Sequence, residues 1–234
     1  MSARFLLLSD IHGNKEALFS ILNKENNYDM VIIAGDLTGF GNRKEASEML
    51  SIIREHASGR PYFFVAGNCD TLQARECFAE DPGYLESVSS RVYLTCSEQE
   101  DLCLAGSGGG LLHTGMTCFE RTEEDLAGSL RSGLGHAGTR PVDIIVTHTP
   151  PHGTMADLRH GRHLGSREFL ALLYEVQPAL WVCGHIHESA SAVYEERTLV
   201  VNPGPAIQGK YALAVAGQRD QAGLLHFHAE LRSL

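Results

Sequence analysis

The chain is poor in positive charge. It has 19 Lys and Arg residues against 29 Asp and Glu residues, which gives a formal net charge of −10 over 234 residues. Proteins that bind nucleic acids in general present a strongly basic face. The charge balance therefore argues against a general nucleic-acid-binding protein.

Long apolar runs are also absent. No segment approaches the roughly 18 apolar residues that a membrane-spanning helix needs, so we expect no membrane association. The N-terminus lacks a basic segment that leads into an apolar stretch, which is the pattern of a secretory signal. We therefore expect a cytoplasmic protein.

Paired cysteines are missing as well. The six cysteines are scattered and form no CxxC motif; they are Cys69, Cys77, Cys96, Cys103, Cys118 and Cys183. Without a signal peptide, an even number of cysteines does not indicate a disulfide framework. We expect reduced, mostly buried thiols, with Cys69 considered separately below.

The remaining composition is that of an ordinary globular enzyme, with 43% hydrophobic and 21% charged residues. The sequence contains no internal repeat, low-complexity tract or evident linker. We therefore expect a single domain over residues 1–234.

Strand and helix patterns alternate through much of the chain. We expect strands at 4–9, 30–35, 61–66, 142–147 and 179–183, and helices at 14–24, 44–57, 121–131 and 166–176, with another helix opening near residue 70. Residues 91–112 resemble a hairpin, and strands are expected at 190–195, 198–202, 211–216 and 223–230. This βαβ rhythm predicts parallel strands with right-handed crossovers. The predicted fold is α/β, with two mixed sheets packed face to face and helices outside.

Five short motifs follow apolar runs that are predicted to be strands. They are Asp10-Ile11-His12, Gly35-Asp36, Gly67-Asn68-Cys69-Asp70, Thr147-His148 and Gly184-His185-Ile186-His187. The carboxyl ends of strands in an α/β sheet lie at one edge, where ligands bind. We therefore expect two Asp, four His and one Asn side chains to converge there: Asp10, His12, Asp36, Asn68, His148, His185 and His187.

This donor set is typical of a centre with two metal ions. Asp10 and His12 would point the same way on a continuing strand, and Asp36, at the end of the neighbouring strand, could bridge both ions. Oxygen and imidazole ligands without thiolates suit Mn²⁺, Fe, Zn²⁺, Ni²⁺ or Co²⁺. Ions about 3.5–4 Å apart can clamp a phosphoryl group during in-line displacement. One such histidine alone would more often be structural, but seven compatible positions favour a metal site.

The ordered set of motifs resembles the calcineurin-like metallophosphoesterase superfamily, from Asp10 to the Asn202-Pro203-Gly204 turn. The resemblance implies a four-layer αββα sandwich. It further implies that Asp10, His12 and His187 hold one metal, that Asn68, His148 and His185 hold the other, and that Asp36 bridges them. Mn²⁺ is the favoured ion, and no organic cofactor is expected.

The same resemblance implies the reaction. A hydroxide that bridges the two ions would attack the phosphorus of a small phosphorylated substrate in line. Phosphodiesters are favoured over monoesters. The acidic chain can bind such a substrate because the two cations add local positive charge. We list Asp36, Asn68, His148, Cys69 and His152 as catalytic candidates.

Cys69 departs from the family pattern, which is commonly Gly-Asn-His-Asp/Glu with a histidine that protonates the leaving group. A thiol, with a reference pKa of about 8.5, is a weaker acid than imidazolium. Cys69 could have a chemical role or only fill a tight turn. If it donates no proton, His152 is the first alternative donor.

Four other segments carry weaker signals. The loop of residues 147–165 is rich in Pro, Gly, His and Arg, and we expect it to overhang the metals. The residues in it that could contact substrate are His152, Arg159, His160, Arg162 and His163. Gly106-Ser107-Gly108-Gly109-Gly110 lacks the Lys-Ser/Thr of a phosphate-binding loop and is expected to be a turn near the active-site rim. His226 and His228 are expected on a surface strand, and the Asn202 turn is expected to shape the wall of the site.

Two other functions remain open at this level. The first is a phosphomonoesterase, acting on nucleotides or proteins. The second is a catalytically weak protein-binding scaffold, such as the retromer subunit with this kind of fold. The complete ligand set argues against the scaffold. The sequence leaves the oligomeric state and the physiological substrate open.

Overall fold

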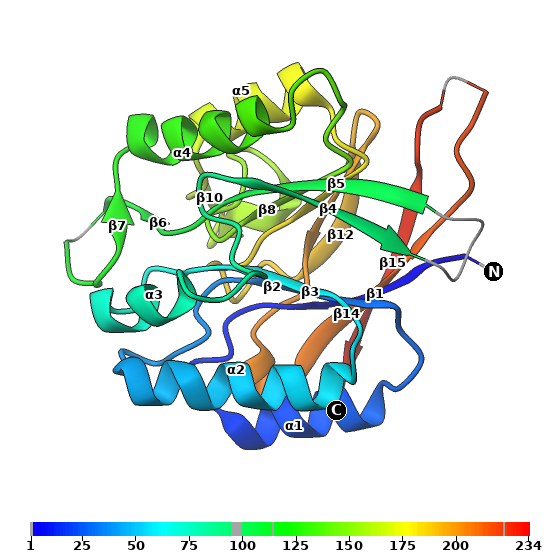
Figure 1. The fold of residues 1–234 in the computed structure, drawn as a ribbon. Coiled ribbons are helices and arrows are strands. Elements are labelled where there is room, and N and C mark those ends of the chain that lie inside the picture. The colour runs from blue at the N-terminus through cyan, green and yellow to red at the C-terminus, as the bar shows by residue number, and fades with distance from the viewer. Residues whose placement is uncertain (1, 95–99, 114, 222) are drawn as a thin grey trace.

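The fold is built on two large mixed sheets (Figure 1). The structure is a computed structural model that describes residues 2–94, 100–113, 115–221 and 223–234. The first sheet has the order β15-β14-β1-β2-β3, with bounds β1 (Arg4–Leu8), β2 (Met30–Ala34), β3 (Tyr62–Val65), β14 (Lys210–Ala216) and β15 (Phe227–Ser233). Strands β1, β2 and β3 are parallel. Strand β14 is antiparallel to β1, and β15 is antiparallel to β14.

The second sheet has the order β12-β13-β11-β8-β5-β4. Its strands are β4 (Ser89–Leu94), β5 (Glu100–Ser107), β8 (Ile144–Thr147), β11 (Leu180–Val182), β12 (Ser191–Glu195) and β13 (Thr198–Asn202). The four inner strands are parallel, and the edge strands β12 and β4 are antiparallel to their neighbours. In both sheets the carboxyl ends of the parallel strands therefore share one edge.

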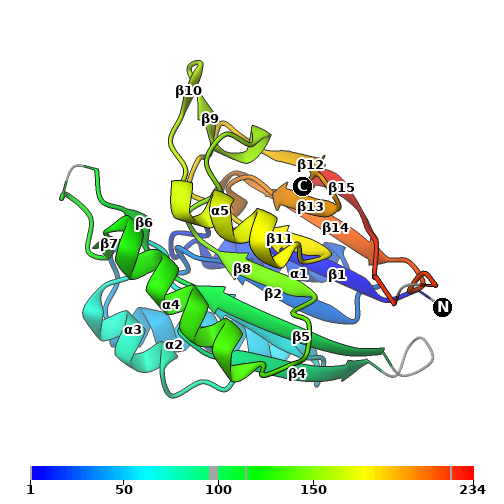
Figure 2. The same cartoon turned by 90° about the horizontal axis from the view of Figure 1, so that it is seen from above.

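Helices cover the outer faces of both sheets (Figures 1 and 2). The first sheet carries α1 (Lys15–Lys24), α2 (Arg43–Ala57) and α3 (Leu72–Phe78); the second carries α4 (Glu123–His136) and α5 (Arg167–Val176). A side-chain oxygen caps the N-terminus of each helix, as when Asn14 accepts the Ala17 N–H at 3.0 Å. These caps satisfy amides that have no partner inside the helix and fix where it starts.

The buried side chains sort into three layers. Along β1, Phe5 and Leu7 point between the sheets, while Leu6 and Leu8 point toward the helices. This alternation is the period of two that a strand imposes. A third cluster, which includes Trp181, packs the second sheet against α4 and α5. The predicted four-layer αββα sandwich is confirmed.

The structure corrects several predicted details. Helix α4 extends to His136, and β15 begins at Phe227 rather than at residue 223. The loop of residues 147–165 contains a one-turn helix (Met155–Asp157) and a small hairpin of β9 (Leu158–Arg159) and β10 (Arg162–His163). Two-residue strands carry no measurable hydrophobic period, so sequence patterns cannot reveal them.

The glycine-rich segment is a tight connection between strands. Gly106 and Ser107 end β5, and the chain turns at Gly108 and Gly109 into β6 (Gly110–Leu111), which pairs with β7 (Glu120–Arg121). A Cβ on Gly110 would lie 2.7 Å from the Cβ of Asn68. The segment is thus a turn pressed against a predicted metal ligand, as expected, and not a phosphate-binding loop.

Two other expectations concern cysteines and membranes. Cys69, Cys77, Cys103 and Cys183 are buried free thiols, whereas Cys118 is exposed, and Cys96 lies outside the described residues. Within the described residues, no helix has the length and apolar character that crossing a membrane requires.

Candidate metal centre

The predicted ligands lie where the parallel strands end. Asp10 and His12 follow β1, Asp36 follows β2 and Asn68 follows β3, all in the first sheet. His148 follows β8, and His185 and His187 follow β11, in the second sheet. The structure therefore brings side chains from both sheets to one edge of the sandwich.

Left-handed backbone turns aim several of these side chains. Asp10, His12, Asp36 and His185 have φ values of 54°, 49°, 50° and 69°. Such values are uncommon for residues with a Cβ and gather at functional sites, where the surroundings enforce them. Strand β1 ends at Leu8, so Asp10 and His12 lie on the turn after the strand and not on a continuing strand.

One compact donor group contains Asp10, His12 and His187. His187 Nε2 lies 3.1 Å from Asp10 Oδ1 and 3.4 Å from His12 Nε2. Metal–ligand bonds of about 2.0–2.2 Å place adjacent ligand atoms about 3.0–3.4 Å apart. The spacing of this group therefore fits a single cation.

A second group lies beside the first. His148 Nε2 is 2.9 Å from Asn68 Oδ1 and 3.4 Å from Asp36 Oδ2. The same Asp36 oxygen is 3.7 Å from His12 Nε2 in the first group. Asp36 Oδ2 therefore lies within 4 Å of a histidine nitrogen in each group.

His185 is the seventh predicted ligand. Its ring centroid lies 5.0 Å from that of His148, and its backbone N–H donates to Asp10 Oδ2 at 3.1 Å. Within the described residues it does not join the groups whose donor atoms all lie within 4.8 Å of one another. His185 is among the residues that line the cavity beside the centre.

Hydrogen bonds from outside the two groups orient the donors. The Nδ1 of His148 lies 2.7 Å from the Ala34 carbonyl oxygen, which can only accept a hydrogen bond. Nδ1 must therefore carry the proton, and in the neutral ring the lone pair of Nε2 points at Asn68 and Asp36. The three electron-pair donors, His148 Nε2, Asn68 Oδ1 and Asp36 Oδ2, therefore converge in a way that fits one shared cation.

Close backbone approach is needed at Gly35, which has φ +87°. A Cβ there would lie 2.4 Å from His148 Nδ1. Only glycine accepts both this conformation and this contact.

The buried charges perturb one another in the absence of metal. Burial alone would lower the pKa of His148, but the Asp36 carboxylate outweighs burial and raises that pKa to about 9. Burial and the nearby His148 lower the pKa of His185 to about 4. A divalent cation would displace the proton that Asp36 stabilises on His148, because metal binding releases protons from the ligands.

Cys69 lies beside the centre. Its Sγ lies within 4.8 Å of ligand atoms of His12 and Asp36, and its backbone N–H donates to Asp36 Oδ1 at 2.7 Å. Burial, with Asp36 as the next cause, raises the pKa of the thiol. Cys69 is therefore a neutral group that holds Asp36 through its backbone.

Two residues that support the centre were missed or only partly assigned. Asp70 is fully buried and accepts from Thr38 N, Thr38 Oγ1 and Gly67 N at 2.7–2.8 Å, which ties the ends of β2 and β3 together. Asn202 donates to the Ile186 carbonyl at 3.0 Å, and its Oδ1 accepts from Gly204 N at 2.9 Å. The expectation that the Asn202 turn shapes the wall agrees with this contact.

A cavity of about 430 Å³ opens beside the centre. Asn68 and His185 line this cavity and are also predicted metal ligands. The other lining residues come mainly from the segment after β6 and the loop of residues 147–165; they include Leu112, His113, Glu120, His152, Arg159 and His163. That loop therefore overhangs the site as expected, but His160 and Arg162 are not among the residues that line the cavity.

Glu120 holds in place the segment after β6 that contributes to the lining of the cavity. Its carboxylate accepts backbone N–H groups of His113, Gly115, Met116 and Thr117 at 2.8–3.0 Å. These bonds, first that of His113, hold the pKa of Glu120 below its usual range. Sequence patterns could not identify this role, because the carboxylate binds backbone groups rather than a motif partner.

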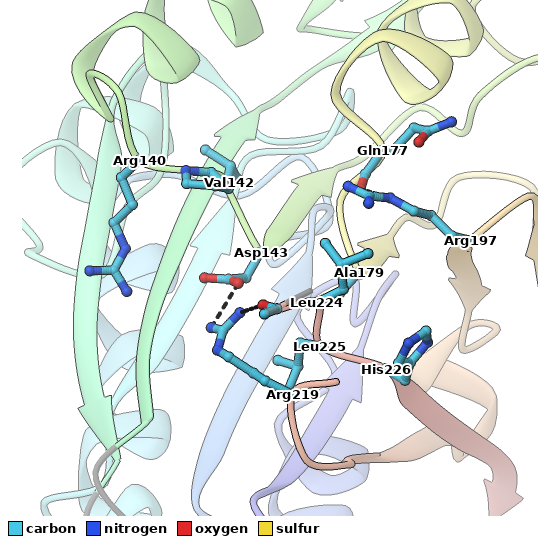
Figure 3. Close-up of a pocket in the computed structure, with 12 residues that line it drawn as sticks. Arg140, Val142, Asp143, Gln177, Ala179, Arg197, Arg219, Leu224, Leu225 and His226 are labelled. Atoms are coloured by element: carbon cyan, nitrogen blue, oxygen red, sulfur yellow. Dashed lines mark hydrogen bonds and ion pairs between the residues drawn. The ribbon is translucent and has the colours of Figure 1, made fainter. Parts of the chain in front are cut away.

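Another cavity, of about 300 Å³, lies at the other end of the sandwich (Figure 3). It is lined by Val142, Asp143 and Ala179, which directly precede β8 and β11, and by Arg219, which pairs with Asp143 at 2.9 Å. His226 borders this cavity and is exposed; it precedes β15 instead of lying within it. It is remote from the metal centre, as expected.

Comparison with known proteins agrees with this architecture. A sequence model of the calcineurin-like phosphoesterase family matches residues 3–189. A curated protein of Methanocaldococcus jannaschii, described as uncharacterised, is 28% identical over 203 residues, which cover 85% of this chain and 86% of that protein.

Solved structures share the fold. A Thermus thermophilus protein aligns with a TM-score of 0.69 at 18% identity, with 97% of this chain and 99% of that chain covered. A dimetal phosphatase from Danio rerio aligns with a TM-score of 0.58 at 12% identity, with 99% and 96% covered. Because the family match spans most of the chain, this protein belongs to the calcineurin-like phosphoesterase family and is a metal-dependent phosphoric ester hydrolase.

Proposed function

We propose that this protein is a phosphodiesterase that works with two divalent metal ions, with Mn²⁺ as the favoured ion. Asp10, His12 and His187 would hold one ion; Asn68, His148 and His185 would hold the other. The observation that carries the proposal is the position of Asp36 Oδ2, 3.4 Å from His148 Nε2 and 3.7 Å from His12 Nε2. One carboxylate oxygen that serves two donor groups is the arrangement of a bridged pair of ions.

Bound divalent cations would supply charge for the phosphate oxygens and an acidified water. The chain contributes position. The Ala34 carbonyl orients His148, and the backbone N–H of Cys69 holds Asp36 Oδ1 at 2.7 Å. Rotation of either side chain would move a donor atom out of its group, so these bonds keep the geometry fixed through the reaction.

The cavity supports a diester substrate. Its volume of about 430 Å³ leaves space beside the centre for a second ester group. Its lining combines the apolar Leu111, Leu112 and Leu164 with the cationic Arg159 and Arg167. Such a lining suits a small phosphorylated compound with an organic substituent. We further propose that residues 1–234 form one domain, and a cytoplasmic location stays a prediction.

The test compares bis(4-nitrophenyl) phosphate with 4-nitrophenyl phosphate. We expect kcat/KM to be at least about tenfold higher for the diester, which corresponds to about 1.4 kcal/mol of transition-state stabilisation. Chelation should abolish turnover, and added Mn²⁺ should restore it. A preference for the monoester would identify a phosphomonoesterase instead, and metal-replete protein without turnover of either ester would favour the scaffold.

A further inference from the structure

The loop over the metal centre contains a fully buried carboxylate, that of Asp157. Its Oδ2 accepts the backbone N–H groups of Gly153 and Gly165 at 3.1 and 2.9 Å. Its Oδ1 lies 2.6 Å from Nδ1 of His163. Burying a carboxylate is costly unless it is paired and hydrogen-bonded, and in the described part of the chain His163 is its only ionisable partner.

This contact fixes the orientation of His163. The residue ends β10, and its side chain is 37% exposed. Because Nδ1 is held by Asp157, the second nitrogen, Nε2, is the one available to a ligand, and no other described residue hydrogen-bonds to it. A carboxylate on one imidazole nitrogen sets the tautomer and orients the ring. Nε2 is then the nitrogen through which His163 can exchange a proton with a ligand.

His163 and the proposed centre border the same cavity. His163 lines the same cavity as Asn68 and His185. Its ring centroid is 5.6 Å from that of His152, the other histidine of the loop in this cavity. In contrast with His163, the side chain of His152 has no hydrogen-bond partner among the described residues.

Other groups near the cavity are less suited to proton donation. Arg159 pairs with Glu188 at 3.0 Å, and a guanidinium does not give up its proton in proteins. Glu120 is bound by loop amides. Cys69 lies beside the centre but is not among the residues that line the cavity. His163 is the one paired imidazole in this described lining.

We propose that His163 is the proton donor to the leaving group and that Asp157 is its positioning residue. This inference rests on the proposed phosphoester hydrolysis. A water oxygen forms the new bond to phosphorus, and the bond from phosphorus to the leaving oxygen breaks with its electron pair on that oxygen. The leaving oxygen takes the proton of His163 Nε2, and the ring then regains the proton that the attacking water releases to solvent.

The test measures kcat/KM for methyl 4-nitrophenyl phosphate and methyl phenyl phosphate, together with the two corresponding monoesters. Phenolate is the poorer leaving group, so it needs the proton more. We expect His163→Ala to lose about 10²–10⁴-fold on the phenyl ester and less than about tenfold on the nitrophenyl ester. In this variant Asp157 keeps its hydrogen bonds from the backbone N–H groups of Gly153 and Gly165, so the loop should remain folded, and Tm checks this.

His160→Ala is the matched control, because His160 is exposed on the same hairpin and outside the cavity lining. We expect it to behave as wild type on all four esters. Equal losses of His163→Ala on both leaving groups would overturn the inference, as would a leaving-group-selective loss in His152→Ala instead. Absence of wild-type turnover on all four esters would overturn the proposed function and this inference with it.

Asp157→Asn tests the positioning role. We expect a leaving-group-selective loss like that of His163→Ala, with KM for the nitrophenyl ester nearly unchanged. An equal loss on both esters, in a variant with the wild-type Tm, would contradict this role. If the variant does not fold, ¹⁵N NMR of the wild-type ring decides: a protonated Nδ1 at His163 supports the pairing, and an unprotonated Nδ1 overturns it.

Discussion

Asp36 is the residue at which the two donor groups meet. Its backbone has a φ of 50°, its Oδ1 accepts the Cys69 N–H, and its Oδ2 faces His12 and His148. Each of these features aims the carboxylate at the space between the groups. A single-site ligand such as His187 contacts only one group, so the two residues should differ when replaced.

We predict that Asp36→Asn binds about one equivalent of metal or less and loses more than about 100-fold in kcat, because even groups that only orient ligands are worth 10–100-fold in metal affinity. Metal content by elemental analysis and kcat on bis(4-nitrophenyl) phosphate provide the measurement. His226→Ala, at the other end of the sandwich, should keep both values. Retention of two metals in Asp36→Asn would remove the bridging assignment.

At the residue scale, the structure brings together the predicted side chains whose chemistry coincides with a strand end. Asp10, Asp36 and His148 could be picked out from the sequence because each lies two residues after an apolar run. Asp157 and Glu120 were not found, because most of their partners are backbone amides of loops. Such contacts depend on tertiary folding and leave no spacing in the sequence.

At the scale of elements, helix α1 and strand β15 are joined by a polar cluster. Glu25, just after α1, accepts from Tyr211 Oη at 2.7 Å and from Arg232 Nη1 at 3.0 Å. Burial alone would raise the pKa of Glu25, but the hydrogen bonds from Tyr211 and Arg232 outweigh it and lower the pKa. The charged form is therefore favoured by the fold.

A lowered folded-state pKa stabilises the protein above the unfolded pKa, and this stabilisation is lost as the pH falls through the folded value. We predict that Glu25→Gln lowers the free energy of unfolding by about 1–3 kcal/mol near about pH 7, the range for hydrogen bonds to charged groups. The difference from wild type should shrink as the pH falls below the unfolded-state pKa, about 4.3, and through the lower folded-state pKa of Glu25. Urea unfolding at neutral and at acidic pH measures this.

Glu230→Gln is the matched control. Glu230 also pairs with Arg232, at 2.8 Å, but its side chain is 62% exposed. An exposed pair contributes about 0–1 kcal/mol, so this variant should unfold much like wild type. A pH-independent difference between Glu25→Gln and wild type would contradict the proposed role of the Glu25 charge.

The helices and long strands were largely predictable, because their apolar periods are local. The caps support this, because Asn14 caps α1 at the point where the helix was expected to begin. Strand β15 was misplaced because residues 223–226 continue an apolar pattern without joining the ladder, which begins at Phe227. The β9–β10 hairpin, which carries His163, is too short to leave a period.

At the scale of the whole molecule, the centre concentrates buried charge. Asp10 and Asp36 are almost fully buried, and the imidazoles nearest to them, those of His187 and His148, come from the other sheet. Without a cation these carboxylates depend on neighbouring imidazoles for compensation. Metal binding therefore bears on stability as well as on catalysis.

We predict that saturating Mn²⁺ raises Tm and that chelation lowers it. A ligand at 100 times its Kd stabilises the folded state by about 2.7 kcal/mol per site, which for a chain of this size corresponds to roughly 5–10 °C. Scanning calorimetry with and without chelator measures the shift. Asp36→Asn should respond less than wild type, and a Tm independent of metal would contradict the site.

The origin of the donors in both sheets has a consequence for the order of synthesis. The last donor supplied by the first sheet is Asn68, and the first supplied by the second sheet is His148. A nascent chain has therefore completed neither group until residues far beyond β3 have emerged, and His187 comes last of all. We therefore expect ion loading to be a late event in the life of a new molecule, and a chain that ends before His148 would lack a donor from each group.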